Sequence, residues 1–166
     1  IFRQQEAEKM TIEKAIPANA SFFVALNLNN TSTFIDRYES YLKANDHYYP
    51  REMNLIEFKN KTNTDPVKLI KEISGTQFAG VYTNINKSNT TQNRFFVAEL
   101  VDQTLANEKF KKAVAELGRT DKTDVNKLHT EYKADGKKTL DIYQLPIKNM
   151  AESLFGRAFS GIQGEY

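Results

Sequence analysis

Residues 76–102 decide the fold, because two apolar runs, Phe78-Ala79-Gly80-Val81-Tyr82 and Phe95-Phe96-Val97-Ala98, stand on either side of a polar linker. Short runs rich in aromatic and β-branched residues predict strands, here over 76–85 and 94–102. The linker, residues 86–93, contains only polar side chains. Consecutive strands joined in this way pair side by side and antiparallel, so the segment predicts a hairpin.

A second hairpin is predicted over 128–133 and 139–145. Apolar and polar residues alternate in its first strand, and Asp135-Gly136 stands at the reversal, where glycine adopts positive φ without steric cost. Another strand is predicted over 21–28. Its apolar residues occupy both faces, which is typical of a central strand that is covered on both sides.

Four helices are predicted from apolar side chains that recur at helical spacing, over 34–44, 66–74, 105–117 and 149–159. Asp65 is a suitable N-cap for the second of them, and Asn149 with Glu152 resembles a capping box at the start of the fourth. A polar helix is also predicted over 3–14. The polar segment 45–64 is expected to be irregular.

Helices do not alternate singly with strands in this order, so the sequence predicts an α+β fold. We expect a largely antiparallel sheet of about five strands, with helices packed mainly on one face. The length of 166 residues suits a single domain over 1–166, with residues 1–15 as an N-terminal helical appendage. Because residues 162–166 resemble the start of a strand, we expect a fragment of a longer chain.

Charge and composition exclude several classes of protein. The 23 basic and 21 acidic residues are spread along the chain, so no basic surface for nucleic acid is predicted. No apolar run is long enough for a transmembrane segment. The chain has no cysteine, which excludes disulfides and thiolate metal sites.

No motif of a known catalytic centre, phosphate-binding loop or nucleotide cofactor occurs, so no catalytic residue and no cofactor is predicted. Two distant histidines without cysteine argue against zinc. Asp121, Asp124 and Asn126 carry suitable oxygens for calcium, but they lack the central glycine and the final glutamate of a calcium loop. No metal site is predicted.

One segment, 45–53, contains residue types suited to binding: His47, Tyr48, Tyr49 and Arg51. Large rings beside an arginine stack on sugars or anchor a protein partner. The alternative is that both tyrosines close over a local core while His47 is solvated. A second hypothesis is an atypical hydrolase that uses acidic residues and His47, and it requires a pocket in which His47 lies beside a carboxylate.

Two further stretches resemble a known group of proteins: Ala15-Ile16-Pro17-Ala18-Asn19-Ala20 before the first strand, and Ile142-Tyr143-Gln144-Leu145-Pro146 with Leu154-Phe155-Gly156. They are similar to uncharacterised envelope lipoproteins of Bacteroidetes-type bacteria. The resemblance implies export to the periplasm or cell surface of a Gram-negative bacterium from a lipid-anchored precursor. No catalytic residue is implied by it.

Together these observations predict a non-catalytic binding or structural module of an exported envelope protein. Its expected partner is a protein or a glycan of the cell envelope. An unpaired strand over 162–166 would also allow pairing with downstream sequence or with a second copy of the chain.

Overall fold

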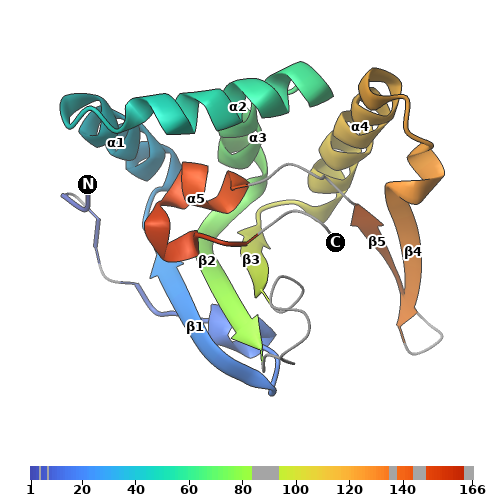
Figure 1. The fold of residues 1–166 in the computed structure, drawn as a ribbon. Helices are drawn as coiled ribbons and strands as arrows, with labels where there is room; N and C mark the ends of the chain where they lie inside the picture. The colour runs from blue at the N-terminus through green and yellow to red at the C-terminus, as the bar shows by residue number, and fades with distance from the viewer. Residues whose placement is uncertain (4, 7, 84–93, 135–137, 144–148, 163–166) are drawn as a thin grey trace.

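The computed structural model describes residues 1–3, 5–6, 8–83, 94–134, 138–143 and 149–162. It confirms an α+β fold with an antiparallel sheet. The elements in chain order are η1 (Ile12–Ala15), β1 (Ala20–Asn27), α1 (Thr31–Ala44), α2 (Tyr48–Thr62), α3 (Pro66–Ile73), β2 (Ser74–Thr83), β3 (Arg94–Leu100), α4 (Gln103–Asp121), η2 (Val125–Lys127), β4 (His129–Ala134), β5 (Lys138–Tyr143), α5 (Met150–Phe155) and η3 (Arg157–Phe159). Figure 1 shows α5 lying across the sheet, with α4 and the β4–β5 hairpin to one side of it.

The main sheet has the strand order β1-β2-β3, and both pairs are antiparallel. The predicted pairing of 76–85 with 94–102 is therefore confirmed over the described residues, and the linker 84–93 lies outside them. The expectation that 21–28 is the central strand is wrong, because β1 is an outer strand of this sheet and Phe22 is 59% exposed. The central position belongs to β2, where the small residues Ala79 and Gly80 allow both faces to be covered closely.

The strands β4 and β5 pair with each other in a separate two-stranded sheet. The second hairpin is thus confirmed, but the expected single sheet of about five strands is replaced, in the described part of the chain, by sheets of three and two strands. Packing explains the separation. Leu128 and Tyr143 lie on Val114 and Leu117 of α4, so the hairpin buries its apolar residues against a helix. The reversal at Asp135-Gly136 is outside the described residues.

One face of the main sheet carries the largest core cluster. Phe78 of β2 contacts the ring of Phe155 in α5, with centroids 4.2 Å apart, and Phe34 of α1 belongs to the same cluster. Gly80 lies on this face too. A Cβ there would be 3.2 Å from Ile162 and 3.3 Å from Phe159, so glycine lets this C-terminal segment approach the sheet closely. The last described residues are thereby packed into the core.

The opposite face of the sheet is covered in part by the N-terminal segment. Ile12 packs on Ala79 and Val81, and the Gln77 side-chain oxygen accepts hydrogen bonds from the backbone N–H groups of Thr11 (2.7 Å) and Ile12 (2.9 Å). The helix predicted over 3–14 is wrong for the described residues, whose only helical element is the short η1. Their sparse apolar side chains could not form a helical stripe, whereas Ile12 finds a partner on the sheet.

The segment 45–64, expected to be irregular, contains the helix α2. Pro50 lies in its first turn, where a missing N–H costs no intrahelical hydrogen bond. The residues that face the interior, Arg51, Leu55, Phe58 and Thr62, follow helical spacing. Two of these four are polar, so the spacing of the apolar residues alone does not indicate a helix here.

The other helices differ from expectation mainly at their ends. The Asp65 carboxylate accepts hydrogen bonds from the N–H groups of Val67 and Lys68, which confirms the predicted cap of α3. The helix α4 continues past Gly118, the expected stop, because that glycine instead makes room for Val125. The predicted capping box at Asn149 is wrong: its backbone is left-handed and its side chain makes no capping hydrogen bond.

Candidate functional site

A groove of about 630 Å³ lies between α1, the start of α2, and the α5–η3 segment. We call it the α1–α2–α5 groove. Its walls come from four parts of the chain: the N-terminal residues Ile1 and Phe2, α1, the start of α2, and the α5–η3 segment. The core around Phe155 brings the helical parts together. A volume of this size suits a small organic ligand or a few residues of a peptide.

The apolar wall of the groove is aromatic. The Phe34 ring lies parallel to the Tyr38 ring, with centroids 6.1 Å apart, and also stacks near Phe155, at 6.5 Å. Phe2 of the N-terminal segment lies 5.6 Å from Phe34 and closes one end of this wall. Aromatic side chains provide large rigid contacts at a low cost in conformational entropy, which favours recognition of apolar or planar groups.

Arg51 of α2 lines the groove, although it is only 4% exposed. Its Nε donates a hydrogen bond to the backbone carbonyl of Ser153 at 2.8 Å, and its Nη1 lies 3.2 Å from the Glu39 carboxylate. Its Nη2 is buried and has no hydrogen-bond partner among the described residues. A buried donor without a partner costs about 1–3 kcal/mol, so this guanidinium has unused capacity to bind an acceptor.

The Glu39 carboxylate is shared by two cations, because the Lys43 ammonium also lies 2.6 Å from it. This hydrogen bond with Lys43 is the largest of the effects that lower the pKa of Glu39, and Arg51 adds to the same shift. One carboxylate therefore faces two cations, and the charge of Arg51 is only partly balanced on the α1 side.

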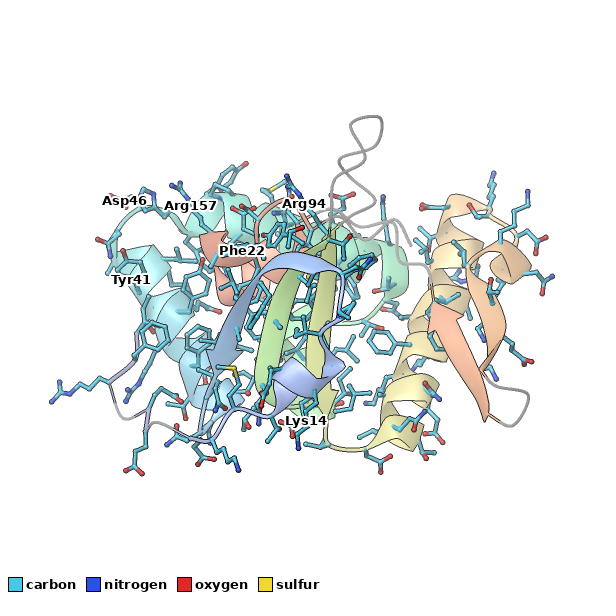
Figure 2. The ribbon with its side chains drawn as sticks, turned by 90° about the horizontal axis from the view of Figure 1, so that it is seen from below. Lys14, Phe22, Tyr41, Asp46, Arg94 and Arg157 are labelled. Atoms are coloured by element: carbon cyan, nitrogen blue, oxygen red, sulfur yellow. The ribbon has the colours of Figure 1, made fainter. Side chains whose placement is uncertain are left out.

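Acidic and basic side chains besides Arg51 also line the groove: Asp46, His47, Glu152 and Arg157. Arg157 is exposed and forms no ion pair with any described residue. Figure 2 shows Asp46, Tyr41 and Arg157 together at the left of the view, whereas Lys14 lies at its lower edge, on the other side of the sheet. The mouth of the groove thus carries charges of both signs.

The hydroxyl of Tyr38 lies within this charged region. Burial raises the pKa of Tyr38 above its ordinary value of 10.0, and Glu152 acts in the same direction, while Arg51 and Arg157 act against it. The phenol therefore stays protonated at neutral pH, and its hydroxyl can donate a hydrogen bond to an acceptor in the groove.

The residues proposed from the sequence are not all brought to this groove. His47 is exposed, immediately precedes α2, and lines the groove with Arg51. Tyr48 lines a smaller hollow of about 260 Å³ on another side of α2, and its ring lies 4.6 Å from the Lys43 ammonium. Tyr49 is 68% exposed and lines neither hollow. The segment 45–53 is thus not a single contact loop.

The geometry provides no developed catalytic or metal centre among the described residues. The His47 imidazole forms no hydrogen bond with a carboxylate in that part of the chain, although Asp46 and Glu152 line the same groove. No cluster of three or more His, Asp or Glu residues there could hold a metal ion. Asp124, one of the oxygen-bearing residues considered for calcium, instead accepts a hydrogen bond from the Asn126 backbone and caps η2.

Sequence reasoning missed Tyr38, Glu152 and Arg157. Each stands in a segment whose local pattern indicates only an ordinary helix with a polar face. No signal in the sequence connects these residues with Arg51, because their proximity depends on how α1, α2 and α5 pack.

Comparison of the chain with protein-family models, with curated proteins and with solved structures finds no match. A search of the described helices finds none that combines the length and the apolar character needed to cross a membrane.

Proposed function

We propose that this chain is a non-catalytic binding module of an exported bacterial envelope protein, and that the α1–α2–α5 groove is its binding site. The buried Arg51 guanidinium at the groove, with its unpartnered Nη2, is the observation that carries the proposal. Natural proteins rarely leave a buried charged donor without an acceptor, so such a group favours a site that a ligand completes. The aromatic wall supplies the apolar contact that a ligand of moderate affinity needs.

The partner expected from the sequence is a protein or a glycan of the envelope, and the groove is compatible with either. A panel of short peptides and neutral oligosaccharides distinguishes the two classes. We expect one class to shift backbone amide resonances at the groove, including those of Tyr38 and Gly156, and to leave the remote η1 unchanged. Shifts confined to other surfaces, or none with any probe, would refute the proposed site.

A pair of variants sharpens this test. Ala158 is exposed and lines the groove, so Ala158→Phe should obstruct it while leaving the fold intact. Ala115 is exposed on α4 and serves as a matched control for the added ring. Ala158→Phe should abolish the ligand-induced shifts, whereas Ala115→Phe should not change them.

The alternative function is an atypical hydrolase that uses acidic residues and His47. Its support is that His47, Asp46 and Glu152 line one groove. Assays with ester, peptide and glycoside substrates test it, and they should show turnover that His47→Gln removes if the alternative holds. Under the binding proposal, the same assays show no turnover above that of buffer.

Export and lipid anchoring are proposed on the resemblance of the segments around Pro17 and Pro146 to envelope lipoproteins. Fractionation of cells that express the full precursor, together with labelling by a fatty acid, tests both. Self-association is a further part of the proposal, because the outer edges of β1 and β3 have no strand partner among the described residues. The mass of the protein in solution tests it directly.

A further inference from the structure

The charges around the α1–α2–α5 groove are not equivalent, although acids and bases both line it. Arg51 is withdrawn from water, whereas Asp46 is exposed. Charges in a poorly solvated position act much more strongly on a ligand than charges screened by water. The groove should therefore favour an anion over a cation at the end where Arg51 lies.

Three groups are available to receive such an anion. The exposed Arg157 guanidinium is free of described ion pairs, and the Tyr38 hydroxyl forms no described hydrogen bond. Arg51 adds a buried positive charge that Glu39 balances only in part, and its Nη2 lacks an acceptor among the described residues. All three line the same groove as Phe34 and Phe155, so a negative group and a large apolar group would be bound together.

We infer that the groove recognises a carboxylate that stands beside a large apolar or aromatic group, as in an aromatic amino acid or the C-terminal residue of a peptide. This inference rests on the proposed function, because it names the ligand class of the same groove. Planar guanidinium groups bind carboxylates through two parallel hydrogen bonds, which favours a carboxylate over a neutral amide of the same shape. Glu152, half-buried in the groove, discourages a second negative charge on the ligand.

The chain contains no tryptophan, so an indole probe can be excited where the protein does not absorb. Four probes share this indole: tryptophan, tryptophan amide, N-acetyltryptophan and N-acetyltryptophan amide. Tryptophan and tryptophan amide form one pair, in which both probes carry an ammonium group. The two N-acetyl probes form a second pair without it. Within each pair, one probe has a carboxylate and the other has an amide in its place. Binding is measured by the fluorescence anisotropy of the indole at increasing protein concentration.

In each pair we expect the carboxylate to bind about tenfold more tightly than the amide, which corresponds to one charge-assisted hydrogen-bonded pair. Equal affinities within the pairs, or tighter binding of either amide, would overturn the inference. Equal binding of all four probes would leave the proposed binding groove intact. If none of the four probes binds, the inference fails. The proposed function fails only if the panel of peptides and oligosaccharides also produces no resonance shifts at the groove.

Two variants test whether the carboxylate of the probe binds to Arg157 and Tyr38. Arg157→Gln should weaken binding of both carboxylate probes about tenfold and leave both amides unchanged, and because Arg157 is exposed the fold is kept. Tyr38→Phe should weaken binding of the carboxylates more than binding of the amides, because the hydrogen bond from the hydroxyl to a charged acceptor is the stronger one. Lys14→Gln, an exposed cation on the opposite side of the sheet, is the matched control and should change no affinity. An equal loss for carboxylates and amides in Arg157→Gln would contradict the assignment.

A peptide of glycines that ends in tryptophan separates the two sources of this chemistry. Tighter binding of the peptide than of free tryptophan identifies a chain end as the ligand. Tighter binding of free tryptophan than of the peptide identifies a small molecule as the ligand. Either result supports the recognition of a carboxylate beside a large apolar group.

Discussion

The Nε of Arg51 donates a hydrogen bond to the backbone carbonyl of Ser153, 2.8 Å away, and this contact joins α2 to α5 across 102 positions of sequence. Asn54, one turn further along α2, donates to the Ser153 hydroxyl at 3.0 Å. Both acceptors belong to Ser153 of α5, the helix whose Phe155 packs on Phe78, so these two hydrogen bonds connect the groove to the centre of the core.

Arg51→Ala should lower the free energy of unfolding by about 1–3 kcal/mol, because the change leaves the buried Ser153 carbonyl without its donor, while Glu39 keeps Lys43 as its partner. Urea unfolding measures the loss. Tyr49→Ala, at an exposed position in the same turn of α2, should change the unfolding free energy by less than about 0.5 kcal/mol. A small effect of Arg51→Ala would mean that Arg51 is not part of the core and acts only in binding.

Gln77→Ala should release the N-terminal segment from the sheet. The Gln77 side chain accepts two backbone hydrogen bonds, from Thr11 and Ile12, so its loss should cost about 1–3 kcal/mol. Hydrogen exchange at the Thr11 and Ile12 amides should become much faster, while exchange in α4 is unchanged. Gln103→Ala, at an exposed position, is the control. Unaltered exchange at Thr11 would show that Ile12 packing alone holds the segment.

Gly156→Ala should destabilise the protein by about 1–3 kcal/mol, because residues other than glycine are strained at positive φ. The backbone of Gly156 has φ 97°, and an added Cβ would lie 3.4 Å from the Tyr38 hydroxyl oxygen. Thermal unfolding measures the change. Ser160→Ala, exposed nearby on the same segment, should have little effect. Equal effects of the two variants would argue against strain at Gly156.

Acid should reduce stability partly through Glu39. The hydrogen bond from Lys43, followed by the charge of Arg51, lowers the pKa of Glu39 below its ordinary value of 4.5. Between that lowered pKa and 4.5 the unfolded state binds more protons, so stability is present above pH 4.5 and is lost as the pH falls through the folded-state pKa.

Glu39→Gln should remove this part of the pH dependence, as judged from urea unfolding at a series of pH values. Glu39 is partly solvated, so its contribution should be at most about 1 kcal/mol. Lys43→Met should reduce the same slope because it removes the largest cause of the shift. If the unfolding free energy depends on pH in the same way in the wild-type protein, Glu39→Gln and Lys43→Met, other carboxylates account for the acid sensitivity.

The local features of this chain follow from sequence. The apolar runs around Phe78 and Phe96 predict two paired strands, and Asp65 before Pro66 predicts the start of α3, because strand alternation and helix capping depend on residues close together in the chain. Local patterns fail for α2, where the inward-facing Arg51 and Thr62 are polar. Thr62 donates to the Phe58 carbonyl one turn earlier in the same helix, whereas Arg51 finds its partner Ser153 only in the folded protein.

Tertiary packing alone decided the position of β1 at the side of the sheet, the separation of the second hairpin, and the attachment of the N-terminal segment through Gln77. It also created the groove, because Tyr38, Arg51 and Arg157 meet only when three helical segments pack together. The periodicity of apolar residues indicates which side chains will be buried, but it does not indicate which distant segment they will pack against. That choice depends on shape and charge complementarity between segments, and here it placed an arginine where a hydrophobic residue would be expected.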